Sequence, residues 1–359
     1  MKAAVYHGPG DLRVEERPKP VAGRDGVVLK VKYCGICPIL DLAFWQSMVG
    51  MVLGNVPGHE YSGEVVEVGS NVSLVKPGDR LYTFDPYTPC YRCPQCLQGD
   101  YWRCANWGEG MGKNGGAYAE YMLIPFITPA SHIVPPANVG WKELALIEPL
   151  HLSVGLAKKV KPGATVLIIG QHIVGLGITT LLKKSGVARK VITSAISKKH
   201  RDASQELGAD LVVDSVNQDL VSVVMKETAG RGVDIVFVTD ARPISYIHGF
   251  SCARDAGQVL LATRFLTPQD PHVRAGWVGP EASSTEKPPT FDTSVIYYEI
   301  AWGTLGTRIP LWQGAVDLLQ SGVINAEKHI THVFPLEKIN DAFKIATDFH
   351  ESIEVMIEL

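Results

Sequence analysis

From residue 161 onward, short apolar segments alternate with helical patterns, and this alternation constrains the fold more than any other feature of the chain. ATVLIIG comes first and runs into a helical pattern at 173–185. KVITSA, LVVD, VDIVFV and GQVLLAT follow in turn, separated by predicted helices from about 198, at about 217–228 and at about 243–254. Buried strands that alternate with helices are typical of a parallel, doubly wound sheet. We therefore predict an α/β fold for this part of the chain.

The first 150 residues have a different pattern, rich in glycine, proline and short runs of valine and isoleucine. GVVLKVKYCG, YSGEVVEVGSNV and GDRLYTF read as short strands joined by turns, which predicts a partly antiparallel barrel. The Pro-rich segment 264–294 is predicted to be a long loop, and loops of this length are usually functional or disordered. The end of the chain, from THVFPLEKIN onward, is predicted as a turn, a helix and a final strand.

Composition and charge exclude several classes of protein. The 359 residues are 46% hydrophobic and 20% charged, with a formal net charge of −3 and no long basic run. We therefore expect neither a nucleic-acid partner nor an acidic membrane surface. No stretch reaches the ~18 apolar residues of a membrane helix, and the first residues lack the apolar run of a signal peptide. The predicted location is the cytoplasm.

Four of the seven cysteines have the spacing C-x2-C-x2-C-x7-C, at Cys90, Cys93, Cys96 and Cys104. In a reducing compartment, such a cluster indicates a metal site more strongly than a disulfide framework. Four thiolates satisfy tetrahedral zinc and leave no position open for a substrate, so the predicted site is structural. The alternative is a set of reduced or disulfide-paired cysteines.

A second group of possible metal ligands is spread along the chain. Cys37 lies on a Gly-Ile-Cys-Pro turn, His59 and Glu60 follow Gly58, and Glu148 lies in LIEPL. Open catalytic zinc sites use three protein ligands drawn from His, Cys and carboxylate groups. Each residue alone is weak evidence, because a single histidine is usually structural. Their order along the chain is the specific signal.

That order resembles a known family. CGIC at 34–37, GHE at 58–60, KPGDR at 76–80 and the four-cysteine lobe resemble the zinc-dependent medium-chain dehydrogenases, in particular the sorbitol, butanediol and threonine dehydrogenase branch. The resemblance implies a GroES-like catalytic domain at 1–152 and 300–359 and a Rossmann domain at 153–299. It implies Cys37, His59 and Glu148 as ligands of a second, catalytic zinc, with Glu60 nearby and able to bind directly. It also implies a homodimer or homotetramer, for which SVIYYEIAW is a possible edge strand.

Hydride transfer to a small-molecule substrate needs a nicotinamide cofactor. The fingerprint G-x-G-x-x-G should end the first strand and open a helix, and here its second glycine is replaced by histidine. A histidine there must either shift the diphosphate or contact it through its ring. The predicted cofactor-binding residues of this turn are Gly170, His172, Ile173, Val174 and Gly175.

The next strand ends without the acidic residue that an NAD site places there to bind the ribose 2′-hydroxyl. Ala195 takes that position, and basic residues up to Arg201 follow it. A carboxylate would repel a 2′-phosphate, so its absence favours NADP(H) over NAD(H). The alternative is that the lysines form the solvated first turn of a helix. The predicted cofactor-binding residues here are Ser194, Ala195, Ser197, Lys198 and Lys199.

The family's proton relay is missing from this chain. The family follows its catalytic Cys with Cys-Gly-Ser/Thr-Asp and a His, and aligning Asp41 puts Ile39 or Leu40 at the hydroxyl position and Ala43 at the His position. Neither replacement can carry a proton, so Glu60, zinc-bound water or His151 would supply it. The predicted reaction interconverts a secondary alcohol or polyol and its ketone. Two alternatives are a reductase of an iminium or conjugated carbonyl compound and a non-catalytic dinucleotide-binding zinc protein.

Overall fold

The structure is a computed structural model, and it describes residues 1–47, 51–82, 93–98, 105, 115–127, 135, 137–240, 242–262 and 305–359. Contacts divide the chain into two compact units, each of which is discontinuous in sequence. Unit 1 comprises Met1–His151, Trp302–Asp348 and Glu354–Leu359, and unit 2 comprises Leu152–Ala301 and Phe349–Ile353.

Unit 2 is built on a five-stranded sheet in which every pair of neighbouring strands is parallel. Its order is β11-β10-β7-β8-β9, so the order of the strands reverses between β7 and β10. This arrangement confirms the predicted doubly wound sheet. The strands are β7 (Thr165–Ile169), β8 (Lys190–Ala195), β9 (Leu211–Asp214), β10 (Val233–Val238) and β11 (Ala253–Leu261).

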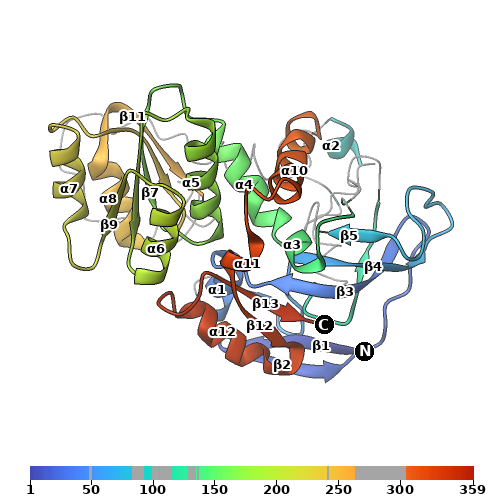
Figure 1. The fold of residues 1–359 in the computed structure, drawn as a ribbon. Helices are drawn as coiled ribbons and strands as arrows, with labels where there is room; N and C mark the ends of the chain where they lie inside the picture. The colour runs from blue at the N-terminus through green and yellow to red at the C-terminus, as the bar shows by residue number, and fades with distance from the viewer. Residues whose placement is uncertain are drawn as a thin grey trace. The chain divides into compact units, whose positions relative to one another are not determined.

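Helices connect these strands and pack in two groups (Figure 1). Helix α5 lies beside α6, and α7 lies beside α8, as expected when helices cover both faces of a doubly wound sheet. Asp219 caps α7 by accepting hydrogen bonds from the backbone N–H groups of Val221 and Ser222. The helices are α5 (Ile173–Ser185), α6 (Lys198–Glu206), α7 (Leu220–Glu227) and α8 (Pro243–Cys252).

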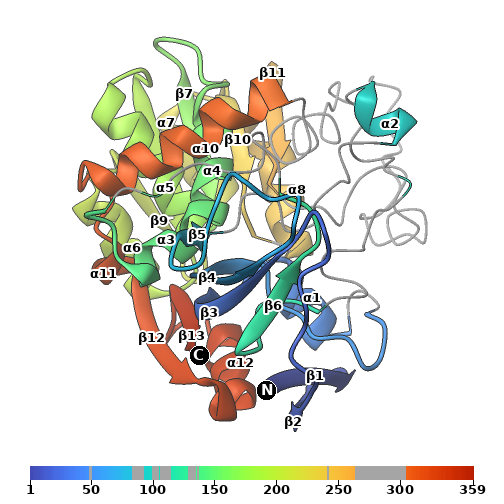
Figure 2. The same cartoon turned by 90° about the vertical axis from the view of Figure 1, so that its right-hand side faces the viewer.

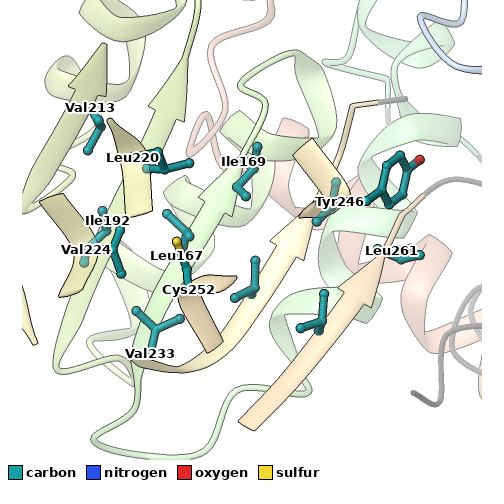
Figure 3. Packing of buried hydrophobic residues seen from close by; sticks show 13 residues of the cluster. Leu167, Ile169, Ile192, Val213, Leu220, Val224, Val233, Tyr246, Cys252 and Leu261 are labelled. Carbon is teal, nitrogen blue, oxygen red and sulfur yellow. The ribbon is translucent and has the colours of Figure 1, made fainter. Parts of the chain in front are cut away.

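The core of unit 2 consists of side chains from its strands and from α7 and α8 (Figure 3). Leu167 and Ile192 from the sheet, Val224 from α7 and Cys252 from α8 belong to one buried cluster. Burial raises the pKa of the Cys252 thiol to about 12, so this isolated cysteine serves packing and is unreactive at neutral pH.

Unit 1 contains a six-stranded sheet of order β12-β13-β3-β4-β5, with β6 also paired to β3 (Figure 2). All its pairs are antiparallel except β12 with β13. A separate hairpin joins β1 (Lys2–Gly8) to β2 (Asp11–Glu16). The strands of the larger sheet are β3 (Val27–Gly35), β4 (Glu60–Val68), β5 (Arg80–Tyr82), β6 (Tyr121–Ile124), β12 (Ile330–Pro335) and β13 (Glu354–Glu358).

The helices of unit 1 are mostly short, and α12 packs against β12 and β13. α4 (Ile147–Ala157) begins in unit 1 and ends in unit 2. The remaining helices are α1 (Leu40–Trp45), α2 (Pro94–Leu97), α3 (Trp141–Ala145), α10 (Leu305–Gln320), α11 (Ala326–His329), the 3₁₀ helix η4 (Leu336–Lys338) and α12 (Ile339–Thr347). No helix in the described ranges is long and apolar enough to span a bilayer.

One detail of the sequence prediction was wrong. The segment expected as a turn before the last helix is strand β12, because Ile330–Pro335 pairs along the whole of β13. The helix predicted at about 243–254 is α8, which ends at Cys252, where β11 begins at once. The predicted loop 264–294 and the predicted edge strand SVIYYEIAW lie outside the described residues.

Candidate active site

Three of the predicted site residues meet in unit 1. Cys37 lies on the turn after β3, and His59 and Glu60 lie at the start of β4. These strands are antiparallel, and their register places Gly35 opposite Glu60. As a result, one sulfur, nitrogen or oxygen atom of each of the three side chains lies within 4.8 Å of the others. All three are nearly or fully buried.

Asp41, on the first turn of α1, holds this cluster in place. Its Oδ1 lies 3.5 Å from His59 Nδ1. Its Oδ2 accepts hydrogen bonds from the Cys37 backbone N–H at 3.1 Å and from the Tyr118 hydroxyl at 2.5 Å. A buried carboxylate facing one ring nitrogen fixes the orientation of a histidine, a common arrangement behind metal-binding histidines.

A second buried carboxylate, Glu354, lies beside Glu60 and was not expected from the sequence. A Cβ atom on Gly35 would lie 3.0 Å from Glu354 Oε1 and closer still to Glu60 Oε2. Gly35 therefore leaves the space that both carboxylates occupy. Both are 1% exposed, and neither accepts an N–H or O–H hydrogen bond from the residues that the structure describes.

The electrostatics of this cluster suit a bound cation. Burial raises the pKa of the Cys37 thiol well above its ordinary value, and the Glu60, Asp41 and Glu148 carboxylates raise it further. Burial and the charges of Glu354, Glu148 and Asp41 likewise raise the pKa of Glu60. A divalent cation would reverse both effects, because metal ligands bind in their deprotonated forms. A sulfur, a nitrogen and an oxygen donor around one point match the ligand types of zinc.

Unit 2 places the predicted dinucleotide turn between β7 and α5. Gly170 has a φ of +91°, which glycine adopts without strain. A Cβ on Gly175 would collide with the Gly170 carbonyl, so only glycine allows helix and strand to approach this closely. Two glycines of the fingerprint are therefore required by the backbone itself.

His172 turns its ring into the protein. The ring Nδ1 accepts a hydrogen bond from the Val174 backbone N–H at 3.4 Å, which caps α5. Nε2 bonds to the carbonyl of Thr239, the residue after β10. In this structure the ring is therefore engaged by protein groups at both nitrogens.

The end of β8 carries the residues predicted to face the adenosine ribose. Ala195 and Ser197 are buried, and Ser197 Oγ bonds to the Nδ1 atom of His200 at 2.7 Å. Lys198 pairs with Asp202, and Lys199 Nζ donates to the Glu351 carbonyl.

Arg201 is a cation that the sequence prediction did not select for this site. Its guanidinium donates to the carbonyls of Ala195 and Ile196 and lies 2.9 Å from Asp214 Oδ2. Asp214 ends β9 and is paired in register with Ala195. Arg201 therefore binds both the end of β8 and a carboxylate from the neighbouring strand β9.

Comparison with known proteins identifies the family. Residues 23–135 match the model of the alcohol dehydrogenase GroES-like domain, and residues 174–273 match that of the zinc-binding dehydrogenase. D-arabitol-phosphate dehydrogenase of Enterococcus avium is 31% identical, with 100% of this chain and 97% of that protein covered. This chain belongs to the zinc-binding alcohol dehydrogenase family. It is an oxidoreductase, and the predicted GroES-like and Rossmann fold classes are confirmed.

Two further relatives cover nearly the whole of this zinc-binding dehydrogenase. Sorbitol dehydrogenase of Halalkalibacterium halodurans is 28% identical over 99% of both chains. A solved zinc-binding dehydrogenase of Sinorhizobium meliloti 1021 bound to NADP is 25% identical, with a TM-score of 0.77 and coverage of 100% of this chain and 99% of that one.

Glu148 and His151 lie on α4, outside the three-residue cluster of this dehydrogenase. Glu148 contributes to the electrostatic potential at Cys37 and Glu60. The His151 ring stacks on Trp312, with centroids 4.2 Å apart and planes 10° apart, and its Nδ1 bonds to the Glu148 carbonyl. The geometry thus brings Glu60 into the cluster with Cys37 and His59, whereas Glu148 as a ligand and His151 as a proton carrier stay predictions.

The wall beside Cys37 is apolar, as its sequence requires. Ile39 and Ala43 are buried, and the Leu40 backbone N–H donates to Cys37 Sγ at 3.3 Å. This bond stabilises a thiolate, but no side chain among these three residues can transfer a proton.

The predicted structural zinc site is only partly described. Cys93 precedes α2, and Cys96 lies within that helix. Cys90 and Cys104 lie outside the described residues. The four-cysteine zinc site therefore stays a prediction from spacing.

Proposed function

We propose that this zinc-binding dehydrogenase interconverts a secondary alcohol or polyol and the corresponding ketone, with NADP(H) favoured over NAD(H). Residues 1–152 and 300–359 would form the catalytic domain, and 153–299 would form the cofactor domain. The observation that carries the proposal is the buried Cys37, His59 and Glu60 cluster, with Asp41 behind His59.

Cys37, His59 and Glu60 would hold the catalytic zinc, with Glu148 as a further candidate ligand. Because His59 Nδ1 faces Asp41, Nε2 would be the ligand atom. When bound, zinc supplies a Lewis acid for the substrate oxygen, and the nicotinamide accepts or donates the hydride. The Leu40 N–H supports the Cys37 thiolate.

Glu60 is the best-placed residue to hold the proton that the alcohol loses, which would go to the carboxylate oxygen that does not bind the metal. It lies in the cluster itself, whereas the His151 ring stacks on Trp312. The apolar residues Ile39 and Leu40 would favour a bulkier and less polar substrate than a simple sugar alcohol.

Cofactor preference depends on the end of β8. Ala195 offers no carboxylate to repel a 2′-phosphate, and Arg201 is anchored next to it. Asp214 competes for that guanidinium, so the preference for NADP(H) would be moderate. Lys198 and Lys199 would contribute a positive electrostatic potential at this end of the sheet.

A panel of alcohols, polyols and ketones tests this function, with pH–rate profiles for the wild type, Glu60→Gln, His151→Gln and Ile39→Ser. We expect turnover of secondary alcohols and a loss of about 10²–10⁴-fold in kcat for Glu60→Gln. Fast oxidation of sorbitol-like polyols that neither Glu60→Gln nor His151→Gln slows would contradict the proton role of these residues.

A reductase of iminium or conjugated carbonyl compounds is the second candidate, favoured by the apolar wall of Ile39, Leu40 and Ala43. Reduction of such a substrate would not pass an alcohol proton through Glu60, so Glu60→Gln would leave it nearly unchanged. The same panel therefore separates the two reactions.

The assembly state and location of the enzyme also follow as proposals. We infer a homodimer or homotetramer, which light scattering of the purified enzyme tests. We also propose that each chain binds two zinc ions and that the enzyme is cytoplasmic.

A further inference from the structure

The hydrogen bonds of His172 define one particular state of its ring. Nδ1 accepts the Val174 N–H, so the ring proton is on Nε2 and is donated to the Thr239 carbonyl. Burial lowers the pKa of His172, which keeps this neutral form at physiological pH. One tautomer satisfies both contacts, and these contacts hold the ring between the Val174 N–H and the Thr239 carbonyl.

The contact with Thr239 crosses the ligand-binding edge of the sheet. Gly170 follows β7 and Thr239 follows β10, and the strand order reverses between these two strands. In open α/β sheets, ligands bind in the crevice outside the carboxyl ends of the strands at this reversal. The His172 ring thus joins the two sides of the crevice.

The contact with Val174 uses a donor that a cofactor would need. Backbone N–H groups in the first turn of a helix have no partner within the helix, and they bind phosphate groups in dinucleotide sites. The Val174 N–H is one of these groups in α5, and His172 already occupies it.

The backbone does not require this arrangement. His172 has φ of −75° and ψ of −170°, an extended conformation that any residue adopts. Glycine at this position would leave the backbone unchanged, and glycine caps a helix nearly as well as a polar residue. The ring can therefore be removed without disturbing the turn.

We propose that His172 is a gating residue, which closes the diphosphate subsite of unit 2 and has to leave it before a nicotinamide dinucleotide binds. This inference rests on the proposed use of NADP(H) or NAD(H). Opening the gate breaks two hydrogen bonds. The population of the closed state therefore weakens dinucleotide binding by about 10–100-fold.

Binding measurements on the zinc-loaded enzyme test the gate. The variants are His172→Gly, which removes both contacts, and His172→Asn, which can still cap Val174 but is too short to reach Thr239. The ligands are NADPH, NADH and adenosine, which carries no phosphate. Nucleotide fluorescence reports binding of the two dinucleotides, and calorimetry reports binding of adenosine.

We expect His172→Gly to bind both dinucleotides about 10–100-fold more tightly, with His172→Asn between it and the wild type and no change for adenosine. Unchanged or weaker dinucleotide binding by a folded His172→Gly would overturn the gate and leave the proposed function intact. If His172→Gly fails to fold, the same criterion applies to His172→Asn. Failure of every variant to bind either dinucleotide would overturn the cofactor assignment and the gate with it.

Discussion

Asp41 is the residue whose side chain connects most of the candidate metal site. One carboxylate oxygen faces His59, and the other accepts hydrogen bonds from the Cys37 backbone and from Tyr118. This role could not be predicted from the sequence, because His59 lies 18 positions after Asp41 and only the fold brings the two side chains together.

Replacing Asp41 with Asn should weaken zinc binding at this site by about 10–100-fold, because the amide holds and polarises His59 less well. Competition with a chromogenic chelator measures the affinity. Asp255→Asn is the matched control, because this exposed carboxylate lies in unit 2. Equal zinc affinity of Asp41→Asn and the control would refute the role of Asp41.

The proximity of Glu354 to Glu60 could not be predicted from the sequence. In SIEVMIEL it is the first of two glutamates that flank an apolar run, which is typical of ordinary residues at the ends of a strand. The register of β13 with β3 places Met356 opposite Gly35, and Glu354 lies two positions before Met356 on the same face. Its proximity to Glu60 depends on the pairing of three strands that are far apart in sequence.

At the scale of elements, the proposed preference for NADP(H) depends on the residues at the ends of β8 and β9. Ala195 and Asp214 are paired in register, and Arg201 bridges them from α6. The sequence shows that Ala195 replaces the acidic residue of an NAD site. It does not show that Asp214 lies beside Ala195, because that depends on the pairing of β8 with β9 in the sheet.

Replacing Ala195 with Asp should shift the ratio of kcat/KM for NADP⁺ over NAD⁺ toward NAD⁺ by ~10-fold or more, because a carboxylate repels the 2′-phosphate. Replacing Asp214 with Asn should shift the ratio the other way, because it releases Arg201. Steady-state kinetics with both cofactors measure these ratios. A higher kcat/KM for NAD⁺ than for NADP⁺ in the wild type would defeat the proposed preference.

At the first turn of α5, the sequence predicts the backbone but not the direction of the His172 side chain. The sequence predicted the strand, the turn and the helix, and it identified His172 as the departure from the fingerprint. It could not decide where the ring points, because that depends on the Thr239 carbonyl at the end of β10. The steric need for Gly175 was predictable, since its close contact lies within the same turn.

At the scale of the whole molecule, the periodicity of apolar residues predicted both sheets because each strand carries its own burial pattern. The parallel sheet of unit 2 was clearest, with apolar runs at 166–169 in β7 and at 235–238 in β10. β12 was missed because its residues are only partly buried, so it has little apolar signal. The candidate site was predicted only in part, because its carboxylates converge through sheet pairing.

Acid should destabilise the molecule through histidines that are buried in the neutral form. Burial lowers the pKa of His200 to about 4, whereas the unfolded chain binds a proton near pH 6.5. The unfolded state therefore binds more protons between these values, and the free energy of unfolding falls as the pH decreases from about 6.5 to about 4. The full effect is on the order of 3 kcal/mol.

Thermal unfolding of the wild type and His200→Asn at pH 7 and pH 4.5 measures this contribution. The Tm of the wild type should fall more between these pH values than that of the variant, because asparagine does not titrate. Parallel pH dependences of the two proteins would show that His200 does not contribute.

Metal content of Cys37→Ser and the wild type, measured together with NADP⁺-dependent alcohol oxidation, tests the central claim most directly. The wild type should contain two zinc ions per chain, and Cys37→Ser should fold, contain about one and lose turnover. Equal zinc content in the two proteins, or full activity of Cys37→Ser, would contradict a catalytic zinc held by Cys37, His59 and Glu60.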